Sequence, residues 1–331
     1  MKRGIRLVAV LAVLAVLALL SAGCASWAST STASPSPRAQ DGAYVVSEQR
    51  VSPRIVDLTV WSPALGRRAI VRLVTPNGWD ERRPGEKWPV LYLLVGSGGS
   101  PADWTDNTDV ADIPALRDVL VVTPEAGDAG WYSNWWNHGN AGPPAWETFH
   151  LTEVRELLEQ GYGAGDRRVI AGLSMGGLGA LIYAARHPGM FRAAASYSGA
   201  VHPLLNPTLT LQPFSDSGAT DPYAIWGDPV AQRPIWLSHD AVDLAPRLRG
   251  LPLFLSVGNG KAGPFDPPGV TDDLEPVLEQ MNLDLAARLA QQGIPATTDF
   301  YGPGTHSWPY WDRELHRSLP LLLKALGTSR T

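Results

Sequence analysis

A serine between glycines stands where a strand is expected to meet a helix. Gly172-Leu173-Ser174-Met175-Gly176 fits the pattern Gly-x-Ser-x-Gly, in which a sharp turn exposes the serine hydroxyl. An apolar run over residues 168–173 predicts a buried strand before it, and residues 175–187 predict a helix after it. Glycines are needed on both flanks because a side chain there would strike the neighbouring elements. The pattern predicts that Ser174 is a nucleophile.

A serine hydroxyl is a poor nucleophile until a base removes its proton. On this kind of strand-turn-helix scaffold the base is a histidine that follows both the serine and an acid in chain order. Of the seven histidines, five precede the strand expected to deliver the acid: His138, His150, His187, His202 and His239. His316 falls inside the predicted closing helix. His306 lies in a glycine-rich loop, residues 302–308, and is the predicted base.

The acid should follow the predicted strand at residues 251–257, because it must orient the imidazole and stabilise the imidazolium. Several carboxylates fall in the following connection: Asp266, Asp272, Asp273, Glu275 and Glu279. Residue type and order alone leave all of them open.

A tetrahedral intermediate also needs two backbone N–H donors for its oxyanion. The residue after the nucleophile, Met175, supplies the first, and the glycine-rich loop Gly96-Ser97-Gly98-Gly99 should supply the second. We choose Ser97 within that loop. The alternative is a flexible turn without a catalytic role.

The elements that position these residues alternate between strand and helix. An opening hairpin is expected over residues 54–61 and 68–74, and the other predicted strands are 88–95, 118–123, 168–173, 191–198, 251–257 and 296–301. Helices are expected over 146–158, 175–187, 272–292 and 308–326. This alternation predicts an α/β fold with a mostly parallel sheet covered by helices on both faces, and ligands at the carboxyl ends of the strands. Residues 44–328 form one catalytic domain, in which 200–249 is a possible small cap.

Composition limits the classes of partner. The chain has 331 residues, of which 44% are apolar and 18% charged, and this is a globular composition. A net charge of -5 provides no basic surface for a phosphate backbone, so nucleic acid is not expected as a partner. Residues 103–112 lack the glycine and the closing glutamate of a calcium loop. No metal and no cofactor are expected.

The N-terminus indicates export. Lys2, Arg3 and Arg6 precede an apolar run over residues 7–20, which is typical of a signal peptide and shorter than the roughly 20 apolar residues that span a bilayer. Cys24 ends a lipobox-like stretch, so residues 1–24 predict a signal peptide and a lipidated cysteine. A Ser/Thr/Pro-rich stretch over 25–43 predicts a flexible tether. We expect a cell-surface lipoprotein held to the membrane by an N-terminal lipid anchor, or a secreted protein.

Several segments, taken together, resemble the antigen-85 family of secreted mycolyltransferases, within the esterase D-like serine esterases of the α/β-hydrolase superfamily. The segments are Tyr92-Leu93-Leu94, Tyr132-Ser133-Asn134-Trp135, Trp146-Glu147-Thr148-Phe149, Gly172 to Gly177, Gly258-Asn259-Gly260 and Gly304-Thr305-His306-Ser307-Trp308-Pro309-Tyr310-Trp311. The resemblance implies the α/β-hydrolase fold, with Ser174 as nucleophile and His306 as base. It places the acid on Glu275, with Glu279 as the alternative.

The chain departs from this family at its substrate site. Mycolyltransferases that use trehalose carry Asp-Gly-Leu-Arg where this chain has Val95-Gly96-Ser97-Gly98. Val95 and Gly98 therefore replace the aspartate and arginine that help to hold the sugar, and Gly96 and Gly98 are expected to line the substrate site without a polar side chain. Trp308 matches a tryptophan beside the acceptor site, although core packing is an equal alternative.

Three functions follow from these residues. The first is a serine esterase that acts on lipid or small-molecule acyl esters. The second is an acyltransferase that passes the same acyl group to a sugar or glycerol hydroxyl. The third is a surface binding protein that has lost catalysis. The esterase is favoured over the acyltransferase because the sugar-holding pair is absent.

Overall fold

A nine-stranded sheet forms the centre of the fold, in the order β1-β2-β3-β5-β4-β6-β7-β8-β9. The computed structural model describes residues 37–140, 142–216 and 221–328. Strands β1 to β3 pair antiparallel, β3 pairs antiparallel with β5, and all later pairs are parallel. The bounds are β1 (Tyr44–Ser52), β2 (Ile55–Ser62), β3 (Arg67–Val74), β4 (Trp88–Leu94), β5 (Leu120–Pro124), β6 (Ala164–Leu173), β7 (Ala194–Tyr197), β8 (Leu253–Gly258) and β9 (Thr297–Gly302).

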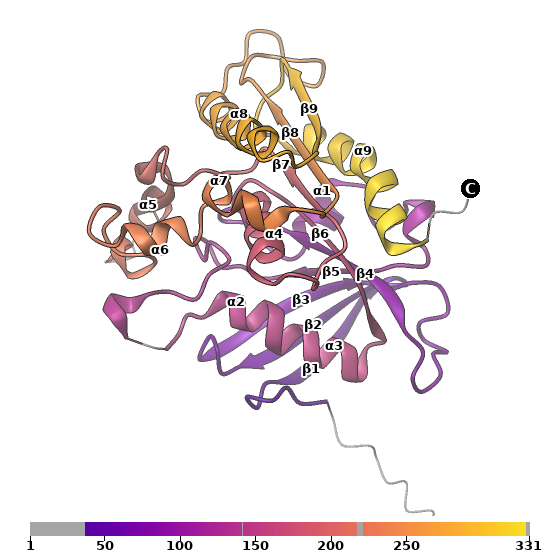
Figure 1. The fold of residues 1–331 in the computed structure, drawn as a ribbon. Helices are drawn as coiled ribbons and strands as arrows, with labels where there is room; N and C mark the ends of the chain where they lie inside the picture. Colours follow the sequence, from indigo (N-terminus) through magenta and orange to yellow (C-terminus); the bar gives the residue numbers. More distant parts are fainter. Residues whose placement is uncertain (1–36, 141, 217–220, 329–331) are drawn as a thin grey trace, which may run out of the picture. The chain divides into compact units, whose positions relative to one another are not determined.

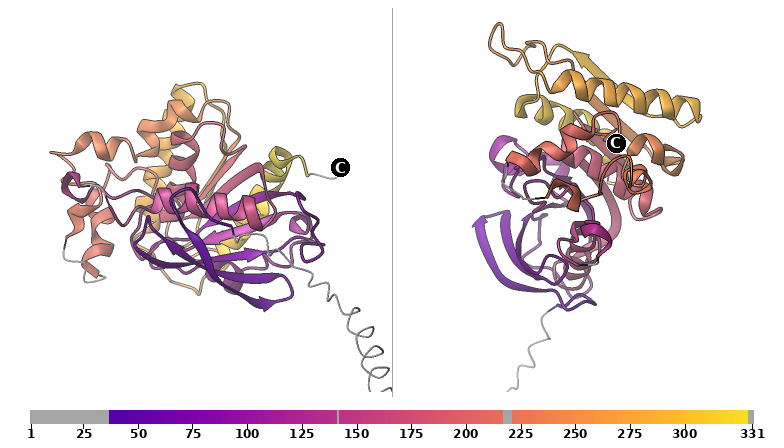
Figure 2. Two further views of the ribbon diagram at one scale, coloured as in Figure 1. Left: turned by 90° about the horizontal axis from the view of Figure 1, so that it is seen from below. Right: turned by 90° about the vertical axis from the view of Figure 1, so that its left-hand side faces the viewer.

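The side chains explain which strands lie inside the sheet. Every residue of β4, β5, β7 and β8 is buried, as expected for parallel strands covered on both faces. Strand β2 instead alternates between buried and partly exposed residues, so only one of its faces packs on the core. Figure 2 shows the antiparallel strands at one end of the sheet and β9 with its neighbouring helix at the other.

Helices cover both faces of the sheet, which confirms the predicted fold class. Figure 1 shows α3, α4 and α8 on one side and α9 with α1 on the other. The α-helices are α1 (Asp103–Asn107), α2 (Trp146–Thr148), α3 (Arg155–Gly161), α4 (Met175–Arg186), α5 (Pro207–Asp216), α6 (Arg233–Leu237), α7 (Ala241–Leu244), α8 (Glu275–Gln291) and α9 (Trp308–Leu326). A π-helix, η3 (Phe149–Val154), joins α2 to α3, and short 3₁₀ turns are η1 (Pro114–Leu116), η2 (Asn137–Gly139), η4 (Pro222–Ala224) and η5 (Ala245–Leu248).

Several elements differ from their predicted bounds, and two of these differences have a clear physical cause. Strand β1 was not predicted, because it is an edge strand whose central residues are exposed and polar. Helix α8 begins at Glu275 and not at residue 272, since Pro276 occupies the first turn and the Asp272 side chain accepts hydrogen bonds from the main chain there.

The end of the predicted tether is also corrected. Ala39 and Ala43 are only 5% and 0% exposed, and the main-chain N–H of Gln40 donates to Oε2 of Glu156 at 2.8 Å. Small apolar side chains and this hydrogen bond attach residues 37–43 to the folded unit, so a tether over 25–43 is too long at its C-terminal end. The predicted signal peptide, Cys24 and the rest of the tether lie outside the described residues. Within the described ranges, no helix is long and apolar enough to cross a membrane.

The segment over residues 200–249, predicted as a cap, contains α5, α6 and α7, and Figure 1 shows α5 and α6 standing away from the sheet. Two buried tryptophans hold this segment, one through a contact with the rest of the domain and one through a contact within the segment. The indole N–H of Trp226 donates to Oγ of Ser133 at 2.9 Å, and that of Trp236 donates to the Gly227 carbonyl at 3.0 Å. The part of the segment around Trp226 and Trp236 is therefore packed against the domain, because both indole rings are buried.

Candidate active site

Ser174 lies on the turn between β6 and α4 in a strained backbone conformation. Its φ and ψ angles are 53° and -122°, which an L-residue adopts only when the surrounding structure enforces it. A Cβ atom on Gly172 would lie 2.3 Å from the Gly176 carbonyl oxygen, and one on Gly176 would lie 2.6 Å from the Leu94 carbonyl oxygen. Both flanking positions must therefore be glycine, and the expected strand-turn-helix context is present.

Neighbouring strand ends bring the other polar groups toward this turn. Ser174 follows β6, Ser198 follows β7, and Gly258 ends β8. The main-chain N–H of Ser174 donates to the Tyr197 carbonyl at 2.9 Å, and that of Ser198 donates to the Ser256 carbonyl at 2.7 Å. Since adjacent strands lie about 4.8 Å apart, these residues share one edge of the sheet, the carboxyl edge where ligands bind in such folds.

Glu275 and His306 meet at this edge. Oε2 of Glu275 lies 2.7 Å from Nδ1 of His306. The other oxygen, Oε1, accepts hydrogen bonds from the Ser198 hydroxyl at 2.6 Å and from the Gly258 main-chain N–H at 2.8 Å. Glu275 is 0% exposed, so these three donors stabilise a carboxylate that would otherwise be costly to bury.

The remaining acid candidates do not reach the imidazole. Oδ2 of Asp272 accepts a hydrogen bond from the main-chain N–H of His306 at 2.5 Å. Asp266 accepts instead from the Thr305 hydroxyl at 2.6 Å and the Tyr310 hydroxyl at 2.5 Å. Asp273 is exposed, and Glu279 is half-buried one turn into α8. Among the five carboxylates, only Glu275 contacts the ring of His306 in the described structure.

Burial and hydrogen bonding shift the pKa of Asp266 in opposite directions. Burial by itself would raise the pKa of this carboxyl, but hydrogen bonds from Thr305, Tyr310 and the Gly263 main chain together hold the pKa below its usual value. The carboxylate is thus the favoured form, and it fixes the residue directly before His306.

A group of tryptophans borders the imidazole. The ring of Trp311 meets the ring of His306 edge-on, with centroids 4.8 Å apart, and its indole N–H donates to the Ser198 hydroxyl at 3.3 Å. Trp308 packs edge-on against Trp311 and Trp104, at centroid distances of 5.2 Å and 5.3 Å. Trp308 is half-buried, so it packs in this group and also reaches the surface. Contact with an acceptor stays a prediction.

The predicted oxyanion loop abuts the nucleophile. A Cβ atom on Gly96 would lie 3.2 Å from Cβ and 3.7 Å from Oγ of Ser174. The Asp128 carbonyl holds the next two residues, since it accepts from Oγ of Ser97 at 2.5 Å and from the main-chain N–H of Gly98 at 2.9 Å. Met175 is the first residue of α4, where main-chain N–H groups have no partner within the helix. The geometry is compatible with both predicted donors.

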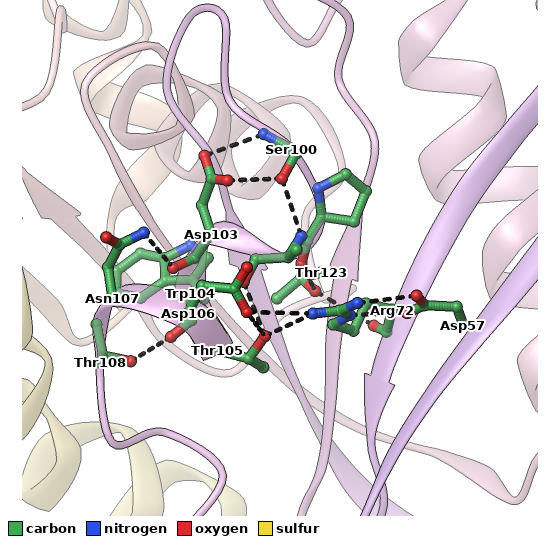
Figure 3. Close-up of polar contacts among 12 residues, drawn as sticks. Asp57, Arg72, Ser100, Asp103, Trp104, Thr105, Asp106, Asn107, Thr108 and Thr123 are labelled. Atoms are coloured by element: carbon green, nitrogen blue, oxygen red, sulfur yellow. Dashed lines mark hydrogen bonds and ion pairs between the residues drawn. The ribbon is translucent and has the colours of Figure 1, made fainter. Parts of the chain in front are cut away.

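Polar contacts fix the segment that follows this loop (Figure 3). The Ser100 hydroxyl donates to Asp103 at 2.6 Å, and the Thr123 hydroxyl donates to the Pro101 carbonyl at 2.7 Å. The Arg72 guanidinium binds Asp57 through two hydrogen bonds and donates to the Thr105 hydroxyl at 2.8 Å. The indole N–H of Trp104 donates to the Leu94 carbonyl at 3.2 Å. Helix α1 is thereby tied to β2, β3 and the end of β4.

One expected contact is not formed. No hydrogen bond joins Oγ of Ser174 to His306 among the contacts of the described residues. Such bonds are often long before substrate binds. The other six histidines have partners elsewhere, which leaves His306 as the histidine on the Glu275 carboxylate. Their partners are Asp221 for His138, Tyr183 for His150, Glu147 for His187, Asp284 for His202, the Ile235 carbonyl for His239 and Asp109 for His316.

A group outside this site could offer ligands to a cation. Atoms of Asp109, Asp312 and His316 lie within 4.8 Å of one another, a grouping of side chains from separate segments that the sequence analysis did not anticipate. Nε2 of His316 and Oδ1 of Asp109 already pair at 2.8 Å, and both side chains are largely exposed. This ion pair accounts for two of the three side chains, and Asp312 lies beside it.

Sequence reasoning missed Ser198 and the contact between Asp272 and the His306 main chain. Ser198 could have been found, because it stands at the end of a predicted strand as Ser174 does. In the structure it also shares a positive φ, 44°. The main-chain contact of Asp272 has no sequence pattern, since it depends on how two loops fold beside each other.

Comparison with known proteins gives the family. The Esterase family model, described as "Putative esterase", matches residues 62–322. Esterase Rv1288 of Mycobacterium tuberculosis (strain ATCC 25618 / H37Rv) is 37% identical over 163 residues, 48% of this chain and only 35% of that relative. The diacylglycerol acyltransferase/mycolyltransferase Ag85B of Mycolicibacterium smegmatis (strain ATCC 700084 / mc(2)155) is 32% identical over 294 residues, 82% of this chain and 85% of the relative.

Solved structures share the fold. MPT51 of Mycobacterium tuberculosis superposes with a TM-score of 0.65 at 24% identity, over 81% of this chain and 97% of that one. A ferulic acid esterase gives a TM-score of 0.62 at 24% identity, over 82% and 98%. The family match and the Ag85B relative confirm the resemblance stated above. The chain belongs to the Esterase family and has the α/β-hydrolase fold.

Proposed function

We propose that this enzyme hydrolyses carboxylic esters through an acyl-enzyme on Ser174, with His306 as base and Glu275 as the acid that orients it. The main-chain N–H groups of Met175 and Ser97 would bind the oxyanion. The observation that carries the proposal is the buried Glu275 carboxylate on Nδ1 of His306, at the strand edge where Ser174 stands on its strained turn.

In the first half-reaction, Nε2 of His306 takes the hydroxyl proton of Ser174 as Oγ attacks the ester carbonyl. The carbonyl oxygen becomes an oxyanion held by the two main-chain N–H groups. Collapse of this intermediate breaks the carbon–oxygen bond to the alcohol, and His306 returns its proton to the departing alkoxide. The acyl group is then esterified to Ser174.

In the second half-reaction, His306 takes a proton from water, and the resulting hydroxide oxygen attacks the acyl carbon. The second tetrahedral intermediate expels Oγ of Ser174, which recovers the proton from His306. The products are a carboxylic acid and the free enzyme. Ionised Glu275 accepts from Nδ1 throughout, so that Nε2 remains free to take the proton.

A fluorophosphonate probe tests this proposal. The folded wild-type protein should be labelled on Ser174, identified by mass spectrometry of the modified peptide, and Ser174→Ala should not be labelled. Ser52→Ala, on the edge strand β1, serves as the control, because it removes a serine hydroxyl outside the proposed site. Wild-type protein that resists the probe, or Ser174→Ala that still reacts, would favour the catalytically inactive binding protein.

Acyl transfer is the second candidate, and the Ag85B relative favours it because its name describes an acyltransferase and the match covers 82% of this chain. The catalytic groups would be the same, with a sugar or glycerol hydroxyl in place of water. Val95 and Gly98 stand where the aspartate and arginine would be, and the absence of those two polar side chains supports hydrolysis. Products from a lipid ester, measured with and without trehalose or glycerol, separate the two: acylated trehalose or glycerol as the main product would establish transfer.

We further propose that the protein is exported and anchored through lipidated Cys24, on the basis of the charged and apolar N-terminus and the lipobox-like sequence before the cysteine. Mass spectrometry of the mature N-terminus and membrane fractionation test this. Cys24→Ser should move the protein out of the membrane fraction. An unmodified Cys24 in the mature protein would exclude the anchor.

A further inference from the structure

One carboxylate binds the main chains of both residues in the Glu275–His306 pair. Oδ2 of Asp272 accepts from the His306 N–H at 2.5 Å, while Oδ1 accepts from the N–H groups of Leu274 at 2.8 Å and Glu275 at 3.3 Å. The first contact fixes the loop that carries the imidazole, and the second pair fixes the start of α8, which carries the acid.

Asp272 is itself held in place by the main chain. Its N–H donates to the Gly260 carbonyl at 2.8 Å, and the Gly260 N–H donates to the Gly304 carbonyl at 2.9 Å. Gly260 has a φ of 75°, and a Cβ atom there would lie 2.2 Å from the Asp272 carbonyl oxygen. Hydrogen bonds thus connect Asp272 to the turn at residue 260, and that turn to the loop before His306. The bond from the His306 N–H to Asp272 completes the ring of contacts.

From these contacts we propose that Asp272 is a positioning residue of the reaction, an inference that rests on the proposed function. It sets the spacing between Glu275 and His306 by holding both main chains with a single rigid group. Its negative charge also lies beside the residue that becomes an imidazolium during each proton transfer, where a fixed anion stabilises the developing charge. Glu275 is the other carboxylate in contact with His306, and Asp266 holds the preceding Thr305.

The test uses Asp272→Asn with Asp273→Asn as its matched control, because Asp273 is exposed and one residue away. An asparagine presents its NH₂ group to either the His306 N–H or the N–H groups of α8, whichever way it is turned, so one set of bonds must be lost. We expect kcat for a soluble p-nitrophenyl ester to fall about 10- to 100-fold, the usual effect of a misplaced catalytic group. KM should change less than twofold, and the control should keep wild-type kinetics.

A second variant, Asp272→Ser, separates positioning of His306 from support of α8. A serine hydroxyl can accept from the first turn of the helix but is too short to reach the His306 N–H as well. Asp272→Ser should therefore lose kcat as Asp272→Asn does, and its rate of fluorophosphonate labelling should fall in parallel. Wild-type kcat in either folded variant, or a loss confined to KM, would overturn the inference. Lack of labelling in the wild type would instead contradict the proposed function.

Discussion

The Glu275 carboxylate lies 2.7 Å from Nδ1 of His306 and is fully buried beneath it. Because an ionised carboxylate only accepts hydrogen bonds, this contact requires the proton of the neutral imidazole to sit on Nδ1. The Nε2 lone pair is then available for the serine hydroxyl. In the proposed reaction, the buried carboxylate thus selects the tautomer that general-base catalysis needs.

Glu275→Gln should retain the fold and lose most of the activity. A glutamine can turn its NH₂ group toward Nδ1 and favour the wrong tautomer, a change that lowers kcat by about 10⁴-fold in serine proteases. Esterase kinetics on the purified variant measure the effect. Glu279→Gln, one turn later on the same helix, is the control and should retain activity. Equal losses in both variants would reopen Glu279 as the acid.

Ser198→Ala should lower activity less than Glu275→Gln. The Ser198 hydroxyl donates to Oε1 of Glu275 at 2.6 Å, and hydrogen bonds to charged groups contribute about 1.5–3 kcal/mol. We expect kcat to fall by roughly 10- to 100-fold, since 1.4 kcal/mol corresponds to a factor of ten.

Ser196→Ala is the matched control for this variant. Ser196 lies two residues earlier on β7, and its buried hydroxyl has no hydrogen-bond partner in the described structure. Its removal should leave kcat unchanged and should not reduce stability. If Ser196→Ala loses as much activity as Ser198→Ala, the loss comes from packing of β7 and not from the bond to Glu275.

The sequence predicts the regular parts of this fold because burial is periodic there. The all-apolar run of β4 and the helix from Trp308 to Leu326 both lie where the pattern predicts them. Ser174 and His306 follow from chain order and loop composition. The choice between Glu275 and Asp272 cannot be made from chain order, because both residues follow the same strand. Only the three-dimensional path of the connection places the Glu275 carboxylate on the His306 ring and the Asp272 carboxylate on the His306 main chain.

The contacts of Arg72 that hold helix α1 lead to a prediction about the free energy of unfolding. Arg72 binds Asp57 through Nε and one terminal nitrogen, at 2.7 Å and 2.8 Å, and reaches Thr105 with the other. A lysine cannot reproduce this planar arrangement. Arg72→Lys should therefore lower the free energy of unfolding by about 1–3 kcal/mol, measured by urea denaturation. Arg68→Lys, on an exposed site of the same strand, should change it little; an equal loss would show that the arrangement around Asp57 is not the cause.

The buried carboxyl of Glu153, in η3, predicts how the free energy of unfolding depends on pH. Glu153 is 0% exposed, and its Oε1 accepts from the Ala64 N–H at 2.8 Å. Burial, reinforced by nearby Asp41, raises the pKa of Glu153 to about 7 despite hydrogen bonds from Ser62 and Ala64. The folded state therefore binds this proton more tightly than the unfolded state does, and the resulting stabilisation is present below the unfolded value of about 4.3 and is lost as the pH rises through about 7.

Glu153→Gln should accordingly stabilise the protein at high pH and not at low pH. The glutamine keeps an oxygen for the Ala64 N–H and removes the anion that is costly to bury. We expect its unfolding free energy to exceed that of the wild type by on the order of 1 kcal/mol at pH 8, with the difference vanishing toward pH 4.5. Denaturation at several pH values measures this, with Glu81→Gln at an exposed position as the control. A difference that stays constant across the series would mean that Glu153 does not change its protonation on folding, because a raised pKa must appear as a slope in stability against pH.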